Sequence, residues 1–157
     1  MALRAAHAGA AVLQEIGLPH PGFAAELKGK GDYVTAADRR SEHAILEVLA
    51  REAPGIAVLA EEEGGTRAGT MWAVDPLDGT TNFTRGFPIV GVSVALLERG
   101  LPVVGVVLAP FLNLEFTAVS GGGGAARSRG GRARDRLVRR RHVDRDGQHP
   151  GRVAGGA

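Results

Sequence analysis

The sequence predicts an α/β fold in which helices and strands form layers. Two stretches with apolar residues at helical spacing come first, and short runs of alternating apolar residues follow them, separated by turn residues. The chain has 157 residues, 44% of them hydrophobic, which is enough for one modest domain with its own core. The pattern therefore predicts two N-terminal helices and then a mainly antiparallel meander of strands.

The first helix is expected at residues 3–17, where apolar or small residues recur every three or four positions. The segment Leu-Pro-His-Pro-Gly at residues 18–22 ends it, because proline cannot continue a helix. The second helix is expected at residues 35–51, before Pro54. Its apolar face consists of Ala37, Ser41, Ala44, Ile45, Val48 and Leu49.

Short apolar runs, several of them bounded by turn residues, predict the strands. Two of them deliver an acidic residue at their carboxyl ends, namely Glu61 and Asp75. A third alternates large apolar residues with glycine, serine and alanine, so one face of that strand carries small side chains. The expected strands cover residues 56–60, 71–74, 90–97, 103–108 and 114–119.

Charge divides the chain into two regions. Residues 1–124 hold nine basic and 14 acidic side chains, whereas residues 125–157 hold ten arginines and three aspartates. The second region has few large apolar residues, so it cannot bury enough surface to offset the entropy of ordering. We expect a folded part at residues 1–124 and a disordered Arg/Gly-rich tail at residues 125–157.

Composition also excludes some classes of protein. The chain has no cysteine, which excludes disulfides and thiolate metal sites, and its five histidines show no metal-binding spacing. The apolar run at residues 8–13 is too short for a membrane span and lacks the layout of a signal peptide. The expectation is a cytoplasmic protein without a membrane partner.

The main cluster of candidate functional residues is D-P-L-D-G-T-T-N-F, which begins at Asp75. A turn here can aim the carboxylates of Asp75 and Asp78 and the carbonyl of Leu77 at one point, which suits a hard cation such as Mg²⁺. A helix that begins next to this turn would offer N–H groups to a phosphate. The alternative is an Asx-type turn, in which aspartate and Gly79 only close the bend.

Three blocks of sequence together resemble the inositol monophosphatase family. The first is the stretch from Asp75, which is followed by R-G-F-P and by a strand that contains Ser93. The second is residues 28–38, which resemble the family segment K-x-x-x-D-x-V-T-x-x-D, and the third is A-E-E at residues 60–62. The resemblance covers about residues 3–124 and implies a layered α+β sandwich of the inositol monophosphatase type.

The resemblance also implies an activity and partners. Family members are Mg²⁺-dependent phosphomonoesterases that hydrolyse small polyol or sugar phosphates such as inositol monophosphate. Histidinol phosphate, fructose bisphosphate and nucleotide phosphates stay open as substrates, and a homodimer is an arrangement that the family uses.

By resemblance, two or more Mg²⁺ ions are held by Glu61, Asp75, Asp78 and the Leu77 carbonyl. Glu61 and Asp75 hold the first ion, and Asp75 and Asp78 share the second. The alternative for Glu61 is a solvated glutamate at a strand end, within the acidic run at residues 61–63.

The resemblance also implies catalytic roles. Thr80 and Glu61 position and polarise the attacking water, and Asp38 supports Thr80. The alternatives are structural: Thr80 would be an N-cap, and Thr35 with Asp38 would form a capping box for the second helix.

Substrate-binding roles follow from the same resemblance. Gly79 and Thr81 lie where backbone and hydroxyl donors would meet the substrate phosphate. Lys28 corresponds to a lysine near the glutamate side of the metal site, although a lone lysine in a glycine-rich loop is usually solvated.

Residues 125–157 depart from the family. Family members continue with a W-D-x-A-A-G-like motif, whose aspartate completes the second metal site, and nothing here resembles it. We therefore expect impaired hydrolysis by this chain. The tail is interpreted as an out-of-frame end, so shifting the reading frame near the codons for residues 121–124 should restore the motif.

A competing hypothesis is a catalytically inactive phosphatase-like protein whose basic tail binds nucleic acid. Ten arginines can contact phosphate backbones in a salt-dependent way. The tail has no aromatic residue for base stacking and no recognisable module, so nucleic acid is the less favoured partner.

Overall fold

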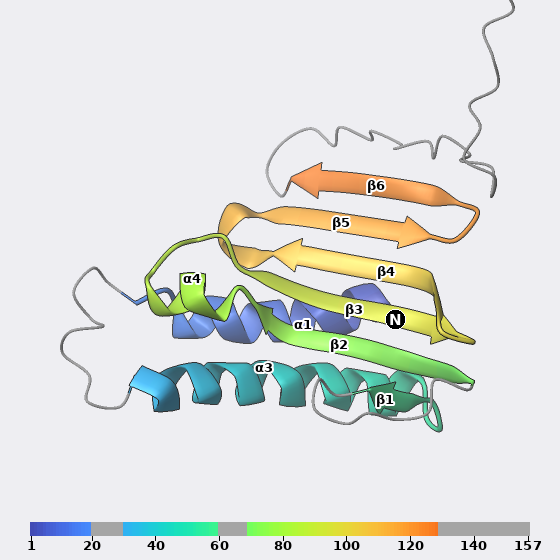
Figure 1. Ribbon diagram of the computed structural model, residues 1–157, viewed down its shortest axis with the longest axis horizontal. Coiled ribbons are helices and arrows are strands. Elements are labelled where there is room, and N and C mark those ends of the chain that lie inside the picture. The colour runs from blue at the N-terminus through green and yellow to red at the C-terminus, as the bar shows by residue number, and fades with distance from the viewer. Residues whose placement is uncertain (20–29, 60–68, 129–157) are drawn as a thin grey trace, which may run out of the picture.

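The structure is a computed structural model that describes residues 1–19, 30–59 and 69–128. Within these ranges two helices come first and six strands follow, with two short helical segments between strands (Figure 1). The elements are α1 (Ala2–Ile16), α3 (Lys30–Glu52), β1 (Ala57–Leu59), β2 (Thr70–Asp78), α4 (Thr80–Thr84), β3 (Gly91–Glu98), β4 (Leu101–Ala109), η1 (Pro110–Leu112), β5 (Leu114–Val119) and β6 (Gly123–Ser128).

The six strands form one sheet in the order β1-β2-β3-β4-β5-β6. β1 pairs with β2 in parallel, and every other neighbouring pair is antiparallel. Helix α1 contacts β3 and β4, helix α3 contacts β2, and the two helices also contact each other. The layered arrangement of helices and a mainly antiparallel sheet confirms the predicted fold class. None of the described helices is long and apolar enough to cross a membrane.

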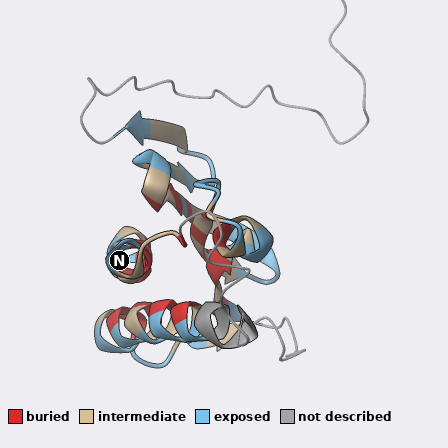
Figure 2. Ribbon diagram, turned by 90° about the vertical axis from the view of Figure 1, so that its left-hand side faces the viewer, coloured by how far each residue is buried: buried red, intermediate tan, exposed pale blue. Residues whose placement is uncertain are grey.

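The core lies between the two helices and the sheet. Figure 2 shows buried residues where α1 and α3 face the strands. On β3, Val92 and Val94 are fully buried in this core, while Ser93, which alternates with them, is directed to the opposite face. The alternation that predicted a strand with a small-residue face is therefore present, and the valines are the side that faces the helices.

Helix α3 begins at Lys30, five residues before the expected start at Thr35. Thr35 and Asp38 consequently lie inside the helix, and their interpretation as a capping box is wrong. No proline lies between residues 23 and 35 to block the extension, and threonine or aspartate costs only tenths of a kcal/mol in a helix interior.

The last described strand of the sheet also differs from expectation. Residues 123–128 form β6, which pairs with β5 in the register Thr117↔Ala125. The expected boundary after residue 124 falls inside this strand, so the expectation of disorder is wrong for residues 125–128. A strand of small residues needs no apolar alternation of its own when its backbone pairs with a neighbour. The rest of the expected tail lies outside the described residues.

Candidate metal centre

The two aspartates of the motif lie on β2, at a point where its pairing with β3 slips. Asp75 is opposite Ser93, and Asp78 is opposite Gly91. Three steps along β2 therefore match two steps along β3, which defines a β-bulge. The sequence placed the end of the strand at residue 74, but the strand continues through the bulge because β3 pairs on both sides of it.

The bulge changes which face of the sheet the aspartates occupy. In a regular strand, residues three positions apart point to opposite faces. Here the partners Ser93 and Gly91 are two positions apart, so Asp75 and Asp78 share one face, the one opposite the helices. A Cβ placed on Gly91 would lie 3.7 Å from Oδ2 of Asp78, in agreement with this placement.

The peptide groups of the bulge are held by the side chains around them. Oδ1 of Asp75 accepts a hydrogen bond from the Leu77 N–H at 3.1 Å. The Thr80 hydroxyl donates to the Leu77 carbonyl, also at 3.1 Å. The hydrogen bond between Asp75 and Leu77 is the contact of an Asx-type turn, which was the alternative to a metal site at this motif. Asp75 therefore shapes the turn, and this role is compatible with a role in binding.

Gly79 connects the bulge to α4. Its φ is 83°, and an added Cβ would lie 2.9 Å from the Ile89 carbonyl oxygen, so both backbone and space require glycine. Gly79 is itself the N-cap of α4, so the interpretation of Thr80 as N-cap is wrong. Thr80 is the first helical residue instead, and its hydroxyl is engaged with Leu77.

Two side chains hold α4 and the loop that follows it. Phe83 is fully buried and its ring centroid lies 6.3 Å from that of Phe111. The Asn82 amide donates to the Ile89 carbonyl at 2.8 Å. These anchors leave Asp78, Thr80 and Thr81 exposed at the surface, where a soluble ligand can reach them.

Of the three remaining candidates, only Asp38 lies among the described residues. Asp38 lies on α3 one turn before Ser41. The Ser41 hydroxyl donates a hydrogen bond to the Pro76 carbonyl, so both residues lie on the side of α3 that is nearest the bulge. Helix α3 also contacts α4. Glu61 and Lys28 lie outside the described residues, so their roles stay predictions. Within the described ranges no three His, Asp or Glu side chains converge.

Sequence reasoning missed two groups. Ser41 was predicted to lie on the apolar face of its helix and was given no role. A polar residue within that apolar face was the sequence signal that could have pointed to its hydrogen bond. His7 was given no role, yet its Nε2 lies 3.0 Å from Oε2 of Glu115. These two residues are 108 positions apart, so no local pattern could have joined them.

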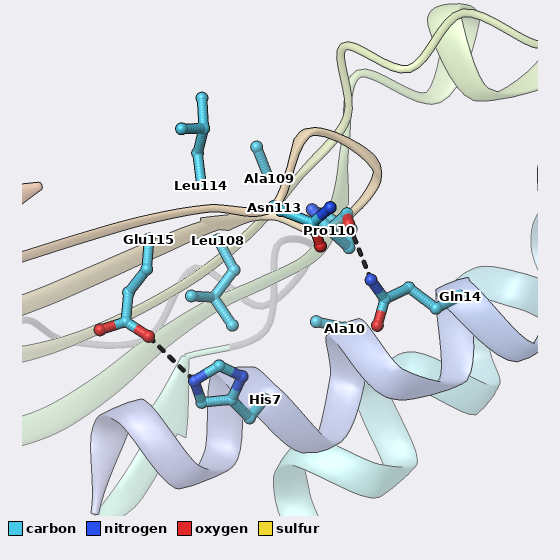
Figure 3. Close-up of a pocket in the computed structure, with 9 residues that line it drawn as sticks. All are labelled: His7, Ala10, Gln14, Leu108, Ala109, Pro110, Asn113, Leu114 and Glu115. Atoms are coloured by element: carbon cyan, nitrogen blue, oxygen red, sulfur yellow. Dashed lines mark hydrogen bonds and ion pairs between the residues drawn. The ribbon is translucent and has the colours of Figure 1, made fainter. Parts of the chain in front are cut away.

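The His7–Glu115 pair borders a pocket between α1 and the sheet (Figure 3). The Gln14 amide closes its other end by donating to the Pro110 carbonyl at 2.7 Å. Its lining residues come from α1, β4, η1 and β5 and from the residue before β5, so the pocket is separate from the bulge in β2. The His7–Glu115 pair and the hydrogen bond from the Gln14 amide both connect α1 to the sheet side of the pocket.

A further ion pair joins the two helices. Nη2 of Arg4 lies 2.6 Å from Oε2 of Glu52. The hydrogen bond from Arg4 lowers the pKa of Glu52 below its ordinary value. This pair lies between α1 and the carboxyl end of α3, so it concerns helix packing rather than the bulge.

Among the described residues, two helices cover one face of the sheet, and the bulge with its carboxylate and carbonyl oxygens lies on the other. This arrangement is that of an α/β protein with a candidate cation site. The model of the inositol monophosphatase family matches residues 1–141, and the chain belongs to that family. The match extends beyond the point near residue 124 where the resemblance was expected to stop.

The curated proteins that are similar to this chain carry different names. A "Nus factor SuhB" of Pasteurella multocida is 44% identical over 62% of this chain and 38% of its own length. A "Histidinol-phosphatase" of Mycobacterium tuberculosis is 48% identical over 63% of this chain and 39% of its own. The solved inositol monophosphatase of Anabaena superposes with a TM-score of 0.63 at 39% identity, over 80% of this chain and 44% of that one. The chain thus spans about two-fifths of the length of these curated relatives.

Proposed function

We propose that this chain carries the metal-binding part of a Mg²⁺-dependent phosphomonoesterase that acts on small polyol or sugar phosphates such as inositol monophosphate. Membership of the inositol monophosphatase family supports a phosphatase of this type. The observation that carries the proposal is the bulge in β2, which directs Asp75 and Asp78 to one face of the sheet.

The donor atoms of the bulge suit a hard divalent cation. Asp75 and Asp78 supply carboxylate oxygens and Leu77 supplies a carbonyl oxygen, the ligand types that Mg²⁺ prefers. Glu61 would add a third carboxylate. When bound, the ions would supply positive charge that offsets the negative charge developing on the phosphoryl oxygens.

Thr80 would orient the attacking water. Its hydroxyl hydrogen is donated to the Leu77 carbonyl, so the lone pairs of Oγ1 can accept a hydrogen bond from water. An acceptor held in this way would orient the water so that its oxygen faces the phosphorus. It would also polarise the O–H bond of the water. Asp38 would support Thr80 from α3, and Glu61 would be a second acceptor.

The substrate would be bound next to this centre. Gly79 and Thr81 would donate to the phosphate, and Lys28 would add positive charge on the glutamate side. The similarity to a histidinol-phosphatase keeps histidinol phosphate as an alternative substrate. A cytoplasmic location remains a prediction from the sequence, and a homodimer remains a prediction that rests on the family resemblance.

The test is a calorimetric titration of Mn²⁺ or Mg²⁺ into the 157-residue chain and two variants. Asp75→Asn removes the charge of the proposed bridging ligand. Glu98→Gln removes one charge from an exposed residue at the far end of β3 and is the matched control. We expect weak binding by the original chain and by Glu98→Gln, and a loss in Asp75→Asn. Equal binding in all three would remove the site.

Phosphate release is then measured with inositol 1-phosphate, histidinol phosphate, fructose 1,6-bisphosphate and a nucleoside monophosphate. We expect slow, Mg²⁺-dependent turnover at most, because nothing in residues 1–157 resembles the W-D-x-A-A-G-like motif whose aspartate completes the second metal site in the family. Rapid turnover would refute the expected impairment. Salt-sensitive binding of nucleic acid, without any metal binding, would favour the inactive nucleic-acid-binding alternative.

A further inference from the structure

Ser41 is a buried hydroxyl on the apolar face of α3. It is fully buried, and within the described ranges it is the single polar residue in the core. Its Oγ donates a hydrogen bond to the carbonyl oxygen of Pro76 at 2.9 Å. This bond joins α3 to the bulge of β2 across 35 positions of sequence.

Pro76 needs a donor from outside the sheet. It lies in the bulge, between the paired residues Asp75 and Asp78, and has no partner in the register of β2 with β3. Pro76 is buried, and a buried carbonyl without a hydrogen bond is destabilising. Ser41 therefore supplies the hydrogen bond that the slipped register does not provide.

Helix α1 limits where the Ser41 side chain can go. A Cβ added to Gly9 would lie 2.7 Å from Oγ of Ser41 and 2.8 Å from Cδ1 of Ile45. Because Gly9 brings α1 this close, the Ser41 hydroxyl is enclosed between α1 and β2. The position of the Pro76 carbonyl is consequently tied to both helices.

We propose that Ser41 is a positioning residue for the metal centre, on the basis of the function proposed above. By holding the Pro76 carbonyl it keeps the bulge in the conformation that directs Asp75 and Asp78 to the same face. It does not touch the ion or the substrate. Its role resembles that of the outer partners which orient metal ligands in other proteins.

The first test compares Ser41→Ala with Val48→Ala, a truncation of a buried residue two turns further along α3. Both variants should lower the free energy of unfolding. Only Ser41→Ala should weaken Mn²⁺ binding, by about 10-fold or more, measured by calorimetry where both variants are folded. A dissociation constant within about twofold of the original chain would overturn the proposal.

A second variant covers the case in which Ser41→Ala does not fold. Ser41→Cys keeps the shape of the side chain but offers only a weak donor. It should bind Mn²⁺ more weakly than the original chain, while Val48→Ala should not. Unchanged affinity in Ser41→Cys would contradict the role assigned to the hydroxyl.

Hydrogen exchange separates this inference from the proposed function, because it needs no metal. The Leu77 N–H donates to Oδ1 of Asp75, so its exchange reports the shape of the bulge. Ser41→Ala should speed exchange at Leu77 relative to Val94 in the regular part of the sheet, and Val48→Ala should not. If the original chain binds no metal, the proposed function fails, and exchange at Leu77 still decides the role of Ser41. An unchanged ratio of the two exchange rates would refute it.

Discussion

The two ends of β2 are stabilised in different ways. Residues 70–74 pair one-to-one with β3 and alternate in the usual manner, with Trp72 buried in the core. At residues 75–78 the register slips, and hydrogen bonds from Ser41 and Thr80 hold the backbone. The regular end depends on burial, whereas the bulged end depends on specific side-chain contacts. Substitutions in the first should lower stability, and substitutions in the second should mainly weaken ligand binding.

The largest effect is expected for the charge of Asp75. Asp75→Asn keeps an oxygen that can accept the Leu77 N–H, so the turn should persist while the proposed bridging charge is lost. We expect Mn²⁺ affinity to fall by more than about 100-fold, and by about 10-fold in Asp78→Asn, with little change in unfolding. Calorimetry and urea unfolding measure both quantities. An equal loss in the two variants would argue against a bridging role.

Val94→Ala tests the regular part of the sheet. Val94 is fully buried opposite Val74, and truncating it should cost about 2–3 kcal/mol of unfolding free energy. Mn²⁺ affinity of the folded variant should be unchanged, because the bulge does not depend on this side chain. A parallel loss of affinity would mean that the two ends of β2 are not independent.

Two glycines with positive φ give a smaller and better matched contrast. Alanine at either Gly79 (φ 83°) or Gly100 (φ 77°) should cost about 1–2 kcal/mol in backbone strain. Gly100 has nothing within 4 Å of an added Cβ, whereas Gly79 meets the Ile89 carbonyl oxygen at 2.9 Å. Gly79→Ala should therefore be the more destabilising variant in urea, and it alone should weaken metal binding. Equal costs would show that Ile89 moves aside freely.

The smallest effect concerns Arg4 and Glu52, which lie away from both ends of β2. The pKa of Glu52 is lowered in the folded chain by the hydrogen bond from Arg4. Such a group stabilises the fold at pH values above its ordinary pKa, and this contribution is lost as the pH falls through the lowered value. Urea unfolding should show Glu52→Gln as less stable at pH 7, and the difference in unfolding free energy should shrink as the pH falls below the ordinary carboxyl pKa. A difference that does not change with pH would mean that it comes from packing instead of charge.

The regular parts of the fold were predictable from sequence because each shows its own periodicity. The helix at residues 3–17 and the strand around Val92 and Val94 follow directly from apolar spacing. The strand β6 was missed because its small residues carry no alternation, and its order comes from pairing with β5.

The candidate centre was predictable only in part. The motif identified Asp75, Asp78 and Thr80, but not how two aspartates three positions apart come to share a face of the sheet. That depends on pairing of β2 with Ser93 and Gly91, and on a hydroxyl from α3. Contacts of this kind join segments that are far apart in the sequence, so no local sequence pattern predicts them.

The most direct test of the proposed centre is anomalous diffraction from crystals of the chain soaked in Mn²⁺. A peak within coordinating distance of the carboxylates of both Asp75 and Asp78, about 2.0–2.3 Å from their oxygens, is the predicted result. The absence of a peak at the bulge, or a peak confined to the pocket between His7 and Glu115, would contradict it.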